Sequence, residues 1–304
     1  MARIAIITDD PGWHGARLRE AFAEQGFLSS CVSLTECRIF VESGSPPVRM
    51  PGFERVLPDG VFVRGVPGGS LEQVVHYLDI LHALKRLGIV VYNDGQAIER
   101  SVDKSMTSFL LQQAGIPTPP TWVTPIDSEA LEIARRELAA GHRLVAKPIF
   151  GSQGQGVQKL ESTEDLSRLV SSGGIFYLQR FVENGHAASS DWRVFVIHGK
   201  AQSAMRRYGK TWLNNVAQGA RCEIAVLDRG LRKLAEDAVS ALDMNYGGVD
   251  IMCDAQGRYC VIEVNSIPAW KGLESVAKVN IARMLAEDFL SLCPASRDDR
   301  AAAL

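Results

Sequence analysis

The sequence lacks the features of several protein classes. Its six cysteines are scattered among 304 residues without a CxxC pair, which argues against a zinc site and a disulfide framework. A net charge of −2 provides no basic field of the kind that binds nucleic acid. No apolar run is long enough to span a membrane, and the N-terminal one is too short for a signal peptide. We therefore expect a cytoplasmic protein with reduced thiols and without nucleic-acid or membrane partners.

Hydrophobic residues make up 46% of the chain, which at this length is enough for two or three compact lobes. The N-terminal part alternates strand-like and helix-like segments, which predicts an open α/β domain. Farther along, strands become more frequent, and a single terminal helix is expected over 276–292. The expected division is an α/β domain at 1–95, a small lobe with a glycine-rich loop at 96–182, a C-terminal lobe with a metal site at 183–295, and a disordered tail at 296–304.

Two strand-like segments, 247–252 and 261–265, flank turn residues and predict a β-hairpin. Counting back from the tip places Asp250 nearly opposite Glu263, with Asn265 on the same face as Glu263, although the register could slip by one. Facing carboxylates repel each other unless a positive charge lies between them. An all-oxygen set suits Mg²⁺ or Mn²⁺ better than Zn²⁺. A solvated hairpin face is the alternative interpretation.

A glycine-rich loop follows a strand that ends at Lys147. Its glycines allow backbone N–H groups to approach an anion, and the lysine ammonium can reach a phosphate. Because Lys147 precedes the glycines and another strand follows, the pattern is neither a Walker loop nor a Rossmann fingerprint. A loop that closes over phosphates fits, and a plain flexible hairpin is the alternative. Lys104 begins a helix, where a cation is disfavoured unless an anion binds nearby, although a solvated surface lysine is equally common.

In this order the motifs resemble the ATP-grasp superfamily, and most closely the RimK-like glutamate ligases. The resemblance spans nearly the whole chain and implies an N-terminal α/β domain followed by two α+β lobes that clasp a nucleotide. It also implies a reaction in which ATP converts a carboxylate to an acyl phosphate, which an amine then attacks. The motifs that carry it are Arg64-Gly65, Asp103-Lys104, Gly115-Ile116-Pro117, Lys147-Pro148, the glycine-rich segment 151–157, the segment 179–182, Asp191-Trp192-Arg193, Arg207, Asn215, the segment 248–251 and Glu263-Val264-Asn265.

The resemblance also implies roles for individual residues. Two Mg²⁺ or Mn²⁺ ions would be held by Asp250, Glu263 and Asn265. The catalytic residues would be Arg207 and Asn215, with Arg193 on the substrate side. ATP would be bound by Lys104, Lys147, Gly151, Ser152, Gln153, Gly154, Gly156, Gln179, Arg180, Phe181, Val182 and Asp191, with the adenine against 179–182 and Asp191 near the ribose.

The chain departs from that pattern at Arg180, at Leu213 and in the segment that leads to Asp191, which is longer by about two residues. Arg180 stands where close relatives carry an acid, and Leu213 stands where they often place an arginine. Lys210 is one replacement for that arginine, and a different substrate is the other explanation. Trp270 and Lys271 lie in the loop that directly follows the strand with Glu263 and Asn265, and they are expected to contact substrate. For Trp270, packing within the loop is the alternative.

The expected substrates are L-glutamate and a carboxylate acceptor, and the resemblance implies a homo-oligomer. We expect a small-molecule acceptor, because the chain carries no charged docking tail and offers an aromatic loop at Trp13 and His14. The resemblance extends to glutamate ligases that act on pterin cofactors, which implies a pterin-like acceptor. Two alternatives remain open. One is a ligase acting on the C-terminus of a protein or carrier protein, and the other is a non-ligase ATP-binding protein or kinase.

Overall fold

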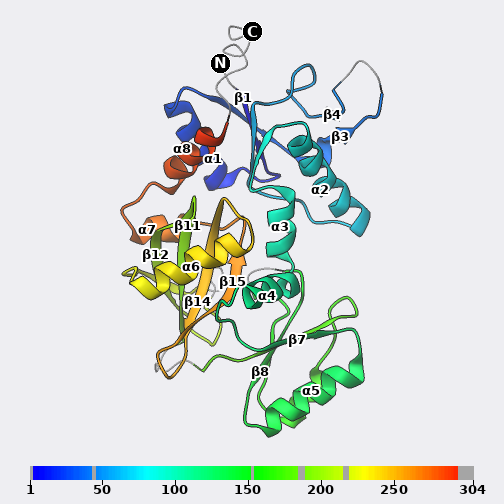
Figure 1. Ribbon diagram of the computed structural model, residues 1–304, viewed down its shortest axis with the longest axis vertical. Helices are drawn as coiled ribbons and strands as arrows, with labels where there is room; N and C mark the ends of the chain where they lie inside the picture. Colours follow the sequence, from blue (N-terminus) through cyan, green and yellow to red (C-terminus); the bar gives the residue numbers. More distant parts are fainter. Residues whose placement is uncertain (1–2, 43–45, 152–153, 184–188, 215–218, 294–304) are drawn as a thin grey trace. The chain divides into compact units, whose positions relative to one another are not determined.

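The computed structural model describes residues 3–42, 46–151, 154–183, 189–214 and 219–293 (Figure 1). The contacts group the chain into two compact units. Unit 1 comprises Met1–Ile98, Met244–Tyr246 and Ile267–Leu304, and unit 2 comprises Glu99–Asp243 and Gly247–Ser266. The division at 95, 182 and 295 expected from the sequence stays a prediction, and the expected tail lies outside the described residues. No helix within the described ranges is both long and apolar enough to cross a membrane.

Unit 1 contains a four-stranded parallel sheet in the order β2-β1-β5-β6, which confirms the open α/β domain. The central strand is buried on both faces, as expected for a parallel sheet covered by helices. Tyr77, Ile80 and Leu84 of α2 pack on one face, whereas Phe22 of α1 and Phe289 of α8 pack on the other. The elements are β1 (Arg3–Ile7), α1 (Gly12–Glu24), β2 (Leu28–Val32), β5 (Gly60–Val63), α2 (Leu71–Arg86), β6 (Val90–Tyr92) and α8 (Ile281–Leu292).

The terminal helix expected over 276–292 is α8 (Ile281–Leu292), which ends at the expected residue but begins later, because a separate short helix precedes it. This short helix, α7 (Lys271–Val276), ends where Ala277 adopts an extended conformation, with φ −109° and ψ 137°. Asn280 then begins α8, because its side chain accepts a hydrogen bond from the backbone N–H of Arg283 at 3.0 Å. Other short elements were not expected from the sequence, namely η1 (Leu34–Glu36), β3 (Arg38–Ile39), β4 (Val48–Arg49) and α3 (Gly95–Val102).

Unit 2 contains a four-stranded antiparallel sheet in the order β7-β10-β8-β9, with α5 (Asp127–Ala139) packed against it. A 3₁₀ helix, η2 (Thr163–Arg168), lies between β9 and β10 in the sequence. At the start of α4 (Lys104–Gln113), the Asp103 carboxylate accepts hydrogen bonds from two backbone N–H groups, which caps the helix. The strands are β7 (Thr121–Thr124), β8 (Leu144–Lys147), β9 (Gln158–Leu160) and β10 (Phe176–Arg180).

The second sheet of unit 2 has five strands in the order β13-β12-β11-β14-β15. Asp250 of β14 pairs directly with Glu263 of β15, and Gly248 pairs with Asn265. This confirms the expected hairpin and fixes the register that the sequence left open. The elements are β11 (Ser190–Ile197), β12 (Lys200–Tyr208), β13 (Arg221–Ile224), α6 (Arg229–Ala241), β14 (Tyr246–Cys253) and β15 (Tyr259–Asn265).

Candidate active site

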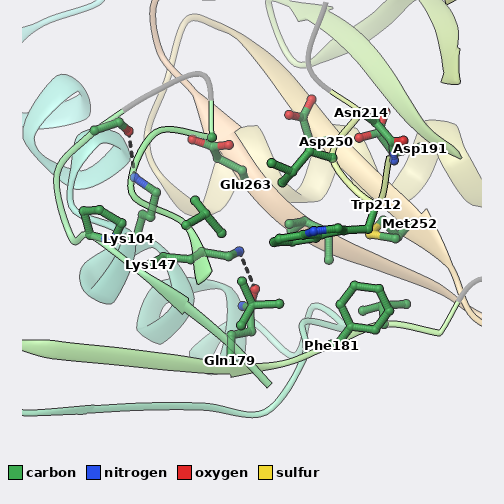
Figure 2. A pocket seen from close by; sticks show the side chains of 18 of the residues that line it. Lys104, Lys147, Gln179, Phe181, Asp191, Trp212, Asn214, Asp250, Met252 and Glu263 are labelled. Carbon is green, nitrogen blue, oxygen red and sulfur yellow. Dashed lines mark hydrogen bonds between the residues drawn. The ribbon is translucent and has the colours of Figure 1, made fainter. Parts of the chain in front are cut away.

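A pocket in unit 2 is lined by residues from both of its sheets (Figure 2). The pocket brings together twelve of the residues expected from the sequence, and these are Lys104, Lys147, Gly151, Gly154, Gln179, Arg180, Phe181, Val182, Asp191, Arg207, Asp250 and Glu263. Gly156, Arg193 and Asn265 are not among the lining residues. Ser152, Gln153 and Asn215 lie outside the described residues.

One wall of the pocket is formed by Lys147 at the end of β8. Its ammonium donates a hydrogen bond to Gln179 Oε1 at 2.6 Å, and the Gln179 amide in turn donates to Thr121 Oγ1 and Tyr177 Oη, both at 3.1 Å. Desolvation lowers the pKa of Lys147 to about 8, and the charge of Lys104 contributes, although Glu263 opposes the shift. Gln179 therefore orients the Lys147 ammonium. The lowered pKa brings the titration of this lysine nearer to neutral pH than that of an ordinary lysine.

The glycine-rich loop is held by Lys104. The ammonium donates to the carbonyl oxygens of Gly151 at 2.8 Å and Ile149 at 3.3 Å. Burial lowers the pKa of Lys104. The loop carbonyl oxygens that accept from its ammonium offset the unfavourable position of this cation at a helix N-terminus. Gly156 has φ +68°, and a Cβ there would lie 2.9 Å from Pro148, so a larger residue would distort the loop. The hydrogen bonds from Lys104 thus hold the start of the expected glycine-rich loop.

A charged network lies behind the hairpin carboxylates. Arg193 binds Asp250 in a bidentate ion pair with both distances at 2.7 Å, and Arg207 Nη2 lies 3.0 Å from Asp250 Oδ2. Arg207 also forms a bidentate pair with Asp191, its direct partner across β11 and β12, at 2.7 and 2.8 Å. Burial alone would raise the pKa of Asp250, but the two guanidinium groups hold it at about 2. Burial raises the pKa of Asp191 despite Arg207.

This network changes the interpretation of two residues. The positive charge that the sequence argument required beside Asp250 is supplied in part by Arg193 and Arg207, so repulsion between the two carboxylates does not by itself require a metal ion. Arg207 donates hydrogen bonds to both carboxylate oxygens of Asp191. A hydrogen bond from Asp191 to a ribose would compete with this ion pair, and it stays a prediction.

The oxygen ligands expected for a metal ion lie at the hairpin. No described residue donates a hydrogen bond to the Glu263 carboxylate, and Asn265 uses its Nδ2 to donate to Gly248 O at 3.4 Å, which leaves its Oδ1 available. Within the described ranges, no group of three or more His, Cys, Asp or Glu side chains gathers as a metal site. The available set is two carboxylates and one amide oxygen, which fits a hard cation that keeps water or phosphate ligands.

The other half of the pocket is apolar. Phe181 and Trp212 make an edge-to-face contact with centroids 6.1 Å apart, and Figure 2 shows Met252 beside the Trp212 ring. The Lys159 ammonium lies 4.4 Å from the centroid of Phe181. Sequence reasoning predicted Phe181 at the pocket but missed Trp212, because Trp212 belongs to no periodic pattern. Other lining residues that it missed are Val145, Asn214, Met252 and Ile262.

The backbone of 179–182, expected to face adenine, is partly committed. The N–H of Arg180 donates to Pro120 O and that of Phe181 donates to Arg143 O, both at 2.9 Å. No described residue accepts from the N–H of Val182, which lines the pocket. Arg180 Nε donates to Glu137 Oε2 at 2.8 Å, so this departure from the family pattern is matched by an acid on α5.

Two residues expected to contact substrate lie in unit 1. Trp270 is fully buried and packs at 4.6 Å from the ring of His14, so the loop-packing alternative is correct for Trp270 in this structure. Its backbone N–H donates to His14 Nε2 at 3.2 Å. Trp13 and His14 lie in the first turn of α1 and not in the expected aromatic loop, and His14 packs against Trp270. Lys271 is exposed.

Comparison with known proteins identifies the family. A model of the RimK-like ATP-grasp domain matches residues 101–289. The tetrahydromethanopterin:alpha-L-glutamate ligase of Methanocaldococcus jannaschii is 35% identical over 241 residues, which covers 76% of this chain and 79% of that protein. The protein of the same name from Methanosarcina acetivorans is 29% identical over 325 residues, covering 94% of this chain and 98% of that protein.

Solved structures show the same fold. The ATP-grasp ligase PsnB, in a complex with minimal precursor, Mg and ADP, superimposes with a TM-score of 0.73 at 20% identity, covering 95% of this chain and 97% of PsnB. A RimK domain ATP-grasp protein from Sphaerobacter thermophilus gives a TM-score of 0.70 at 20% identity, covering 95% of this chain and all of that one. The ATP-grasp fold expected from the sequence is confirmed. The chain belongs to the RimK-like ATP-grasp family, and it is a ligase.

Proposed function

We propose that the chain is an ATP-dependent carboxylate–amine ligase that adds L-glutamate to a small-molecule, pterin-like acid. The proposal is carried by one observation: a single pocket of unit 2 combines an aromatic wall, two lysines and a carboxylate pair braced by arginines. Curated relatives named tetrahydromethanopterin:alpha-L-glutamate ligase support this class of acceptor. The products would be an amide, ADP and phosphate.

In this proposal the adenine lies against Phe181 and Trp212 and accepts a hydrogen bond from the N–H of Val182. The phosphates face Lys147, Lys104 and the glycine-rich loop, whose ammonium and N–H groups balance their charge. Moving Lys104 from the loop carbonyls to a phosphate would release the loop to close.

One or two Mg²⁺ ions, with Mn²⁺ as a substitute, would be held by Glu263, by the Asn265 amide oxygen and by the remaining lone pairs of Asp250. Bound there, the metal would neutralise charge on the phosphate tail. The donor atoms present are all oxygen, which fits this group. Asp250 keeps its orientation because Arg193 and Arg207 bind it from the side of β11 and β12.

The chemistry needs no covalent nucleophile from the protein. A carboxylate oxygen of the acceptor attacks the γ-phosphorus and ADP leaves; the glutamate amine then attacks the acyl carbon, loses a proton, and phosphate leaves. Arg207 is held rigidly by Asp191 and Asp250, so its charge is in place before the reaction and requires no reorganisation. Asn215 is proposed to act together with Arg207, and Arg193 is proposed to assist on the substrate side.

The test is an incubation of the purified protein with ATP, Mg²⁺, glutamate and a panel of acids, with products resolved by mass spectrometry. The panel should contain pterin-linked carboxylates, peptides with free C-termini and carrier-protein termini. A glutamate adduct on the pterin acids supports the proposal, whereas adducts confined to peptides assign the alternative acceptor class. Another structure of PsnB contains a precursor peptide, so peptides are a necessary part of the panel. Phosphate transfer to a hydroxyl without amide formation would identify a kinase.

We expect the apparent KM for ATP to rise about five- to tenfold between pH 7.5 and 9, because Lys147 loses its proton above about pH 8. The apparent KM rises with pH because only the protonated Lys147 ammonium attracts phosphate. Lys147→Arg should flatten this rise because a guanidinium stays charged. Lys147→Ala should weaken ATP binding at pH 7.5 without lowering the melting temperature, as calorimetry can measure. Equal ATP affinity for Lys147→Ala and the unmodified protein would contradict the phosphate-binding role and favour the alternative of a plain flexible hairpin.

A further inference from the structure

The parallel sheet of unit 1 has a topological switch point. From β1 the chain crosses through α1 to β2 on one side, and from β5 it crosses through α2 to β6 on the other side. The carboxyl ends of β1 and β5 therefore lie next to each other where the two crossovers diverge. Open α/β sheets bind ligands in the crevice at such a point. Two cationic side chains, Arg64 and Lys271, and the aromatic side chain of Trp13 lie in this part of unit 1.

Arg64 follows β5 directly and is an uncompensated cation. Its Nη1 donates to Ile267 O at 3.2 Å, and its guanidinium lies 5.1 Å from the ring centroid of Trp270. Its Nε is buried and has no hydrogen-bond partner among the described residues. Burial lowers the pKa of Arg64, and no described carboxylate forms an ion pair with it. Burying a charge without a counter-charge is expensive, so this position is built to receive an anion.

A second cation lies nearby. Lys271 is exposed, its ammonium lies 5.9 Å from the ring centroid of Trp13, and it forms no ion pair in the described part of the chain. Burial lowers the pKa of His14 to about 4, and the charges of Arg64 and Lys271 lower it further. His14 is therefore neutral at physiological pH, which agrees with its acceptance of the Trp270 N–H. The charges of Arg64 and Lys271 thus both act on one neutral imidazole.

An aromatic ring completes the cluster. Trp13 is half-buried and packs on His14 at 5.0 Å and on Trp270 at 6.5 Å, so its position is fixed by two other rings. The two acids closest in sequence are Asp10, whose carboxylate lies beside Gly12, and Asp9, which accepts a hydrogen bond from the Ser33 hydroxyl. The exposed part of Trp13 is available to a planar group, because rings and cations both stack favourably on indole.

We propose that this cluster of Trp13, Arg64 and Lys271 is a binding subsite for an anionic group carried by a planar ring. Arg64 and Lys271 bind the carboxylate or phosphate, and Trp13 stacks on the ring. The assignment rests on the proposed ligase function, in which the ligand is the acid acceptor; it adds that the acceptor carries a planar ring and an acidic group recognised by unit 1. A purely structural Arg64 would instead only brace the loop at Ile267.

The test measures binding of small probes to the full chain by calorimetry, without nucleotide. Benzoate and phenyl phosphate are expected to bind, benzamide about tenfold or more weakly than benzoate because it lacks the charge, and cyclohexanecarboxylate several-fold more weakly because it is not planar. The stronger of the two anions identifies the acidic group. Binding should persist with saturating Mg²⁺ and a non-hydrolysable ATP analogue, because those occupy the pocket of unit 2.

Variants separate the subsite from loop packing. Lys271→Gln changes an exposed side chain and should weaken benzoate binding about five- to tenfold, whereas Lys278→Gln, an exposed lysine in the same unit, should not. Benzoate should raise the melting temperature of the unmodified protein but not that of Arg64→Gln. Equal binding of benzamide and benzoate, no effect of Lys271→Gln, or displacement by the ATP analogue would overturn the proposal.

These outcomes are independent of turnover. If probes bind as expected but no ligase activity is found with any acceptor, the subsite stands and the proposed function fails. If the ligase assay succeeds while benzoate and phenyl phosphate do not bind, only the subsite is refuted.

Discussion

Replacing Glu263 by glutamine is expected to lower turnover by about 10²–10⁴-fold, which corresponds to about 3–5 kcal/mol of metal-dependent stabilisation of the transition state. The change removes one formal charge and keeps the shape of the side chain. Because no described residue donates a hydrogen bond to the Glu263 carboxylate, the melting temperature should be unchanged. Steady-state kinetics and thermal unfolding measure the two quantities.

Glu223→Gln is the matched control, because it removes a half-buried carboxylate, paired with Arg221, from β13 of the same sheet and should leave turnover unaltered. Asp250→Asn should also abolish turnover, but it should lower stability as well, since Arg193 and Arg207 would lose their counter-charge. Full activity of Glu263→Gln and Asp250→Asn at saturating Mg²⁺ would contradict the metal assignment.

Replacing Arg207 by methionine is expected to destabilise the protein by about 3–5 kcal/mol and to lower turnover by at least about 10³-fold. The buried carboxylates of Asp191 and Asp250 would face each other without the guanidinium that now bridges them. Arg207→Lys should recover part of the stability but little of the activity, because an ammonium cannot pair with both carboxylates in bidentate fashion. Chemical denaturation and steady-state rates check both expectations.

The pH dependence of that loss has a defined sign. In the unmodified protein the pKa of Asp250 is held at about 2, so its contribution to stability is present above the unfolded value near 4 and is lost as pH falls toward 2. Without Arg207 the carboxylates bind protons more readily when folded, so the stability difference between Arg207→Met and the unmodified protein should shrink from pH 7 toward pH 4. Arg206→Met, on the same strand, is the control that should show no such convergence.

The hairpin with Asp250 opposite Glu263 could be predicted from the sequence, because alternation with period two and a short turn fix which side chains share a face. The arginine partners of Asp250 could not be predicted in the same way. Arg193 and Arg207 lie on β11 and β12, and only the strand order β12-β11-β14 brings them to Asp250. That order is a tertiary feature that no local pattern contains.

Trp270 illustrates a second limit. Its position directly after a metal-site strand favoured a substrate contact, yet the side chain is fully buried against His14 and beside Arg64. Partners that lie about 200 residues or more away in sequence decided its environment, whereas the sequence showed only its neighbours. The unexpected break between α7 and α8 has a local cause, the cap at Asn280, which a search for Asn within the apolar pattern could have found.

The central claim is that the acid is activated by phosphorylation. The most direct measurement uses the acceptor identified by mass spectrometry, labelled with ¹⁸O in its carboxylate, together with ATP, Mg²⁺ and glutamate. We predict that one ¹⁸O atom appears in inorganic phosphate for each amide formed, that the nucleotide product is ADP, and that phosphate release requires both the acid and the amine. Formation of AMP and pyrophosphate, or ¹⁸O in AMP, would contradict the account, because the acid would then be activated as an adenylate.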